Sequence, residues 1–197
     1  MSIVVEHDKR RWEILEKALD VFIEEGFENA TFQKIADKCC ITRTTLYIYF
    51  KNKRDIFNFS INQFLSILES AIREIAKIAN ISYSEKIIRI MKVIFERLED
   101  NRRLLSVIID YLVYASNSDS EPDYRVRRRT VRMRHLLSTM LIEGIKVGEF
   151  SKSINIKDAN ELLYSIFESA VFRLVVLRRS SVEELVEAMN LAVKRLV

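Results

Sequence analysis

The chain has 197 residues, of which 49% are apolar and 30% charged, and this composition is ordinary for a soluble globular protein of one or two domains. Only 3 glycines and 1 proline occur, too few for the tight turns of a β protein, and the apolar residues recur at helical spacings. We therefore expect an all-α fold. The formal net charge of +4 slightly favours anionic partners but identifies none by itself.

Targeting, membrane and metal-binding features are absent from the sequence. The N-terminus has neither the charge order nor the apolar length of a signal peptide, and no apolar run approaches about 18 residues. The 2 cysteines, Cys39 and Cys40, are adjacent, so they cannot form a disulfide framework or a zinc site with separated pairs. We expect a cytoplasmic protein without membrane, metal or cofactor; thiol sensing by this pair is less favoured than plain packing of Cys39.

The first helix is predicted to follow a loose, flexible arm at residues 1–8. Its apolar stripe has helical spacing (Trp12, Leu15, Leu19 and Phe22). Gly26 suits a left-handed cap at its end, and Phe27 supplies the apolar contact that usually follows such a cap. The basic residues 9–11 either lie against a phosphate backbone or are solvated, and the sequence leaves both readings open.

Residues 31–53 have the pattern of a helix-turn-helix. Thr31 can cap a short helix by accepting a hydrogen bond from an N–H of the next turn. An apolar stripe at spacings of three and four follows it (Phe32, Ile35, Ala36 and Cys39). A turn at residues 40–42 then places Ile41 between the helices and Thr42 at the start of a second helix.

The second helix of this motif, at residues 43–50, has an apolar and a donor-rich face. We expect Leu46, Ile48 and Phe50 to point inward. The outer surface carries hydroxyls and basic groups (Arg43, Thr44, Thr45, Tyr47, Tyr49, Lys51 and Lys53). Between residues 34 and 54 there are six lysines and arginines against a single acid. Because an arginine at a helix start can bond a guanine edge and hydroxyls and lysines can bond phosphates, this surface favours duplex DNA.

Residues 14–57 resemble the tetracycline-repressor (TetR) family of bacterial transcription regulators. The most specific run is Thr-Leu-Tyr-x-Tyr-Phe-Lys-Asn-Lys at residues 45–53. The resemblance implies two groups of DNA contacts, one to bases (Arg43, Thr44 and Tyr47) and one to phosphates (Thr31, Thr45, Tyr49 and Lys53). The family usually has Gly where this chain has Cys40, so a positive φ there would carry strain of about 1 kcal/mol.

The remaining residues are predicted to form further helices. A long helix follows the polar hinge at 51–53, and helices then begin near Tyr83 and after Asn101. The clearest loop is Ala115–Pro122. One helix follows from about Asp123 to Gly148, and two more, near residues 157–178 and 182–196, close the chain.

These features, together with the resemblance, indicate a ligand-responsive transcriptional repressor that binds a palindromic operator as a dimer. Residues 9–55 form the predicted DNA-binding domain and residues 56–197 a helical domain for effector binding and dimerisation. The apolar surface of the last two helices is broader than one packing stripe, which favours a four-helix contact with a second copy.

Large apolar side chains of the helical domain are the candidate effector contacts, although each one singly is more typical of plain core (Phe64, Leu68, Met91, Phe95, Tyr111, Met133, Leu137 and Phe167). They favour a mainly apolar effector. The arginines between residues 125 and 134 are interpreted as a solvated face, with an anionic effector group as the alternative.

An enzyme is not expected. Neither His7 nor His135 has a carboxylate or a nucleophile at a catalytic spacing, and the glycines at 26, 144 and 148 cannot form a phosphate-cradling loop. The remaining alternative is a helical ligand-binding or adaptor protein without sequence-specific DNA binding. A salt-dependent, sequence-selective duplex complex distinguishes the two hypotheses.

Overall fold

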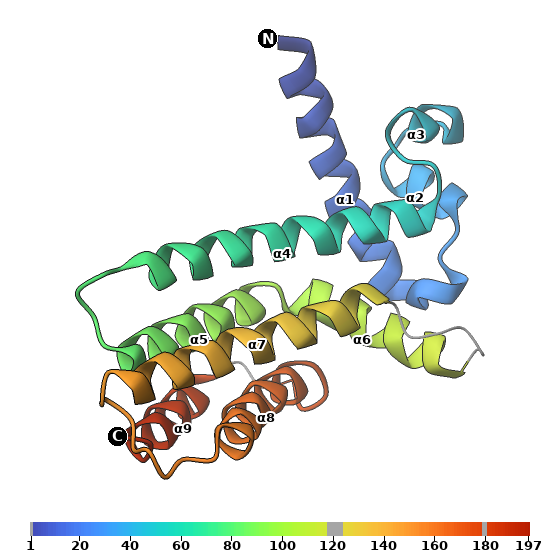
Figure 1. Cartoon of the computed structure of the whole chain (residues 1–197). Coiled ribbons are helices and arrows are strands. Elements are labelled where there is room, and N and C mark those ends of the chain that lie inside the picture. The colour runs from blue at the N-terminus through green and yellow to red at the C-terminus, as the bar shows by residue number, and fades with distance from the viewer. Residues whose placement is uncertain (1, 118–123, 179–180) are drawn as a thin grey trace. The chain divides into compact units, whose positions relative to one another are not determined.

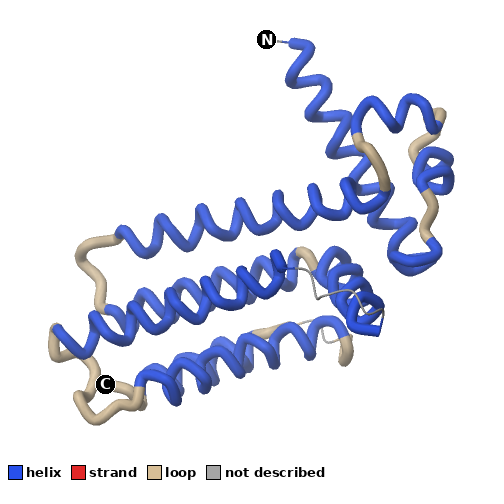
Figure 2. The backbone as a smooth tube through the Cα atoms, turned by 45° about the vertical axis from the view of Figure 1, so that its right-hand side comes forward, coloured by secondary structure: helices blue, strands red, loops and turns tan. Residues whose placement is uncertain are grey.

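The computed structural model describes residues 2–117, 124–178 and 181–197, and within these ranges all regular structure is helical (Figure 1, Figure 2). The expected all-α fold is thus confirmed. The chain divides into two compact units, one of Met1–Ser66 with Arg103–Ser120 and one of Ile67–Arg102 with Glu121–Val197. We refer to them as unit 1 and unit 2.

Unit 1 contains α1 (Ser2–Asn29), α2 (Phe32–Lys38), α3 (Arg43–Tyr49), the first turns of α4 (Lys53–Lys77) and nearly all of α6 (Arg102–Asn117). The flexible arm expected at residues 1–8 is wrong from Ser2 onward, because α1 already includes these residues. They contain no glycine or proline to stop a helix, and the His7 ring packs on that of Tyr49 with centroids 4.8 Å apart.

The end of α1 is marked by Gly26. Its φ of 76° and ψ of 157° break the regular helix, and a further turn runs to Asn29. Phe27 is buried directly after this break, as the cap pattern predicts. The Phe27 amide donates to Asp110 Oδ2 at 3.0 Å, so a carboxylate from α6 satisfies an N–H group at the kink.

Both helices of the motif are capped as predicted. Thr31 Oγ1 accepts from the Lys34 amide at 3.1 Å, and Thr42 Oγ1 accepts from the Thr45 amide at 3.0 Å. Between them Cys40 has φ 55°. Its amide donates to the Asp37 carbonyl while the next amide reaches back to the Ala36 carbonyl, the pattern of a Schellman motif with a non-glycine residue at its left-handed position.

One predicted anchor of α3 is wrong. Leu46 and Phe50 are buried, but Ile48 is 66% exposed. Residues two apart lie about 200° apart around a helix axis, whereas residues four apart share a face. Leu46 and Phe50 satisfy that spacing, and Ile48 between them must point away.

The core of unit 1 includes an aromatic cluster that α6 completes. Tyr111 packs edge-on against Phe27 at 4.8 Å and also contacts Phe57 at 4.8 Å. Its hydroxyl accepts a hydrogen bond from Arg54 Nη2 at 2.8 Å. The domain boundary predicted from the sequence assigns α6 to residues 56–197. In the structure the buried side chains of α6 pack into the core that supports the helix-turn-helix.

Unit 2 contains the last turns of α4 together with α5 (Tyr83–Asp100), α7 (Tyr124–Lys146), α8 (Ile156–Val175) and α9 (Glu183–Lys194). The helix α5 packs against α7, α8 and α9. Its inward stripe is fully buried at helical spacing (Ile87, Ile90, Met91, Ile94, Phe95 and Leu98). The loop predicted at Ala115–Pro122 is wrong for residues 115–117, which extend α6 because no glycine or proline stops them; residues 118–122 lie outside the described residues.

The turn after α7 connects to the start of α5. The Glu149 carboxylate accepts hydrogen bonds from the Tyr83 and Ser84 amides, both at 2.7 Å. Burial raises the pKa of Glu149, but the bonds from Ser84 and Tyr83 outweigh it and hold that pKa below its ordinary value. The next residue, Phe150, lies so close to Gly144 that a Cβ there would be 2.3 Å from the ring.

Candidate nucleic-acid interface

The exposed face of α3 presents the three residues predicted to contact bases. Arg43, Thr44 and Tyr47 are all exposed, whereas Leu46 of the same helix is fully buried. Arg43 Nη2 donates to the Tyr47 hydroxyl at 3.1 Å, and its guanidinium carbon is 5.6 Å from the Tyr47 ring centroid. The side chains are therefore held along the helix surface before any partner binds.

The residues predicted to contact phosphates also lie in unit 1. The Thr31 hydroxyl accepts from the backbone as a cap, and its own O–H remains a donor. The Thr45 hydroxyl pairs with that of Thr42 at 2.8 Å. Tyr49 is half-buried beside His7 at the first turns of α1. The Thr31 hydroxyl therefore keeps a donor for phosphate recognition, whereas either hydroxyl of the Thr42–Thr45 pair can be the donor in the bond between them.

Lys53 has an internal role that the sequence did not indicate. Its Nζ lies 2.8 Å from the Phe27 carbonyl, 2.6 Å from the Glu28 carbonyl and 2.8 Å from the Ala30 carbonyl. Three acceptors match the three donors of an ammonium group. Burial lowers the pKa of Lys53, and the charge of Glu28 opposes this effect. This lysine at the start of α4 thus caps the carbonyls at the end of α1.

Other lysines of the basic segment are paired with the acidic side of α1. Lys34 Nζ lies 2.7 Å from Glu25, and Lys38 Nζ lies 2.8 Å from Glu24. Both pairs are largely exposed, so each contributes little to stability. The positive charge available to a partner near α3 is consequently smaller than the number of lysines and arginines between residues 34 and 54 suggests. On α3 itself the exposed basic residue is Arg43.

The candidate effector residues are divided between the two units. Phe64 and Tyr111 belong to unit 1, where Tyr111 is core, and the other six belong to unit 2 (Leu68, Met91, Phe95, Met133, Leu137 and Phe167). Met91, Phe95 and Leu137 are fully buried. In the arginine segment the described side chains of Arg132 and Arg134 form surface ion pairs with Glu69 and Glu161; the side chains of residues 125–130 lie outside the described part.

The C-terminal helices bury one apolar stripe and expose another. On α8, Leu163, Ala170 and Leu174 are buried, whereas Leu162 and Phe172 are about half exposed. Further exposed apolar side chains lie at the end of this helix (Val176 and Leu177) and on α9 (Leu191). Exposed apolar side chains that follow one another along a helix are typical of a protein-binding surface.

No helix within the described ranges combines the length and the apolar character needed to cross a membrane.

Known proteins with similar sequence and structure are regulators. The family described as bacterial regulatory proteins, tetR family, matches residues 14–58. The fatty acid metabolism regulator protein of Bacillus subtilis is 25% identical over 191 residues, covering 90% of this chain and 94% of that protein. YfiR, a helix-turn-helix transcriptional regulator of the same species, is 30% identical over 152 residues, 76% of this chain and 72% of its own.

Solved structures extend the likeness to the whole fold. The transcriptional regulator FadR of Bacillus subtilis, solved in complex with stearoyl-CoA, has a TM-score of 0.70 at 23% identity and covers 94% of this chain and 97% of that chain. The relatives are regulators, YfiR one of the helix-turn-helix type, and this chain has the same motif, with both helices capped and a donor-rich face on α3. The chain therefore belongs to the tetR family of bacterial regulatory proteins and is a DNA-binding transcriptional regulator rather than an enzyme.

Proposed function

We propose that this protein is a repressor that binds a palindromic operator as a homodimer and is released by a mainly apolar small molecule. The observation that carries the DNA-binding part is the exposed face of α3, where Arg43 is held on Tyr47 by a hydrogen bond of 3.1 Å. Holding a long side chain in place before binding reduces the entropy lost when it meets a base.

The two groups of DNA contacts follow from this arrangement. Arg43, Thr44 and Tyr47 contact base edges in the major groove. Thr31, Thr45 and Tyr49 contact phosphates and fix the register of α3 on the duplex. Lys53 is assigned a supporting role instead, because its ammonium donates to three carbonyls at the end of α1. To contact a phosphate it would have to give up one of these bonds.

Dimerisation is proposed to use the exposed stripe of α8 and α9. Leu162, Phe172 and Leu191 are each about half exposed or more, although the same helices already bury apolar side chains against the rest of unit 2. An isologous contact between two copies would bury the second stripe and give the assembly two-fold symmetry. Two recognition helices related by that axis fit a palindromic operator.

A fatty acyl thioester is the effector class that we propose. One relative is named for fatty acid metabolism, and another was solved with stearoyl-CoA. Six of the eight candidate effector residues lie in unit 2, and all of these are apolar. The helix α4 belongs to both units, so a ligand that alters unit 2 can act through α4 on the spacing of the recognition helices.

Selection of bound duplexes from a random pool, followed by anisotropy titration of the selected operator, tests this function. We expect a palindromic sequence whose affinity falls with salt, and release by acyl-CoA esters that depends on chain length. Converting a population almost wholly DNA-bound into one almost wholly released requires a preference of about 5.5 kcal/mol for the released state. By linkage the operator must weaken acyl-CoA binding by the same factor, so equal affinity with and without operator would refute the mechanism.

A further inference from the structure

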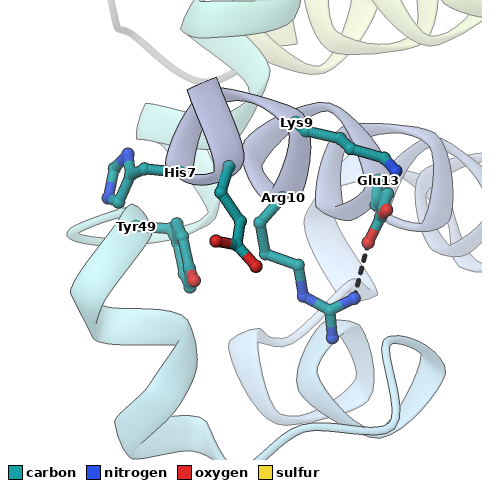
Figure 3. A pocket seen from close by; sticks show the side chains of 6 residues that line it. His7, Lys9, Arg10, Glu13 and Tyr49 are labelled. Carbon is teal, nitrogen blue, oxygen red and sulfur yellow. Dashed lines mark hydrogen bonds and ion pairs between the residues drawn. The ribbon is translucent and has the colours of Figure 1, made fainter. Parts of the chain in front are cut away.

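The first turns of α1 and the end of α3 form the two walls of a cleft in unit 1. It is lined by Glu6, His7, Lys9, Arg10, Glu13 and Tyr49 (Figure 3). The His7 and Tyr49 rings face each other with centroids 4.8 Å apart and an interplanar angle of 31°. Tyr49 is one of the residues proposed to contact phosphates, so His7 lies beside the proposed DNA surface.

The ring contact places the His7 side chain directly beside Tyr49, in a cleft that also holds the charged groups of Glu6, Lys9, Arg10 and Glu13. Arg10 Nη1 lies 2.5 Å from Glu13 Oε2, and this ion pair engages the Arg10 charge (Figure 3). The His7 side chain has no hydrogen-bond partner within the described part of the chain. Because ring stacking uses the faces of the imidazole and not its edge, the ring N–H stays available to an acceptor.

We propose that His7 extends the operator interface by donating its ring N–H to the backbone phosphate that Tyr49 contacts. This inference rests on the proposed function and adds a contact from outside the helix-turn-helix. A phosphate oxygen is a strong acceptor for an N–H donor. The contact positions the protein and carries no sequence preference, so it acts on every duplex alike.

Three substitutions separate hydrogen bonding from packing. His7→Phe keeps a ring against Tyr49 but removes the donor, His7→Gln keeps a donor without the ring, and His135→Phe makes the same change at an exposed histidine of unit 2. One hydrogen bond corresponds to about a five-fold change in affinity per half-site. We expect His7→Phe to weaken the selected operator and random duplexes by this factor, His7→Gln to recover most of the loss, and His135→Phe to bind as wild type.

An operator with a neutral methylphosphonate at the phosphate contacted by Tyr49 supplies an independent readout. The modification should weaken wild-type binding more than binding by His7→Phe, which has already lost the contact. Wild-type affinity of His7→Phe for both kinds of duplex, or equal weakening of both proteins by the methylphosphonate, would overturn the inference. A failed duplex selection would instead refute the proposed function, and the melting temperature of each variant confirms that it is folded.

Discussion

Replacing Lys53 by Met tests whether this residue acts on the fold or on DNA. Methionine keeps the length and apolar character of the stem but removes the ammonium, which donates to the carbonyls of Phe27, Glu28 and Ala30 at 2.6–2.8 Å. A hydrogen bond from a charged donor contributes about 1.5–3 kcal/mol when its partner would otherwise be left without one.

The expected loss of stability is moderate because water can reach the site. Lys53 is half-buried, and its bonds to the Phe27 and Ala30 carbonyls are only partly shielded from water. Water therefore replaces part of each lost bond, and we expect Lys53→Met to lower the free energy of unfolding by about 2 kcal/mol in total. For a chain of this size, that corresponds to a melting temperature lower by about 4–8 °C.

Urea unfolding and the salt dependence of operator binding measure the two roles separately. We expect Lys53→Met to be less stable and to bind the operator more weakly, with an unchanged slope of log affinity against log salt. Lys51→Met is the matched control, since it removes the same charge from an exposed position two residues away. Its stability should change by less than about 0.5 kcal/mol. An unaltered stability of Lys53→Met with a slope reduced by about 0.9 would show that Lys53 binds a phosphate instead.

Three further predictions concern α3, its preceding turn and α5. Arg43→Ala should cost about 1–3 kcal/mol on the operator and relax preference at one position per half-site, and equal losses on operator and random DNA would contradict base contact. Cys40→Gly should raise the free energy of unfolding by about 1 kcal/mol, because φ is 55° there, and an unchanged urea midpoint would count against strain. Since the folded-state pKa of Glu149 is lowered, its carboxylate adds stability that is present above the ordinary pKa of about 4.3 and is lost as pH falls through the folded value. Glu149→Gln should therefore be less stable at pH 7, with a difference from wild type that narrows below about pH 4; a difference independent of pH would refute the assignment.

The sequence determined those features whose causes lie within one or two helical turns. Thr31 and Thr42 each cap a helix by bonding an amide three residues later, and such a partner is visible in the local pattern. The positive φ at Cys40 likewise follows from the turn in which it lies. The expected inward position of Ile48 was wrong because a spacing of two was assigned to one face of a helix, although the geometry needed to exclude it is local.

The tertiary structure alone decided which distant groups meet. Lys53 bonds a carbonyl 26 residues away, the Glu149 carboxylate bonds an amide 65 residues away, and Asp110 bonds the Phe27 amide across 83 residues. In the sequence, Lys53, Glu149 and Asp110 are ordinary charged residues of a helix or turn. The residues next to them in the chain do not indicate which distant group each one bonds. These contacts place α6 in the core beneath the helix-turn-helix and give Lys53 a capping role. They depend on how the helices pack, and helical periodicity specifies which face of a helix is buried but not which other helix buries it.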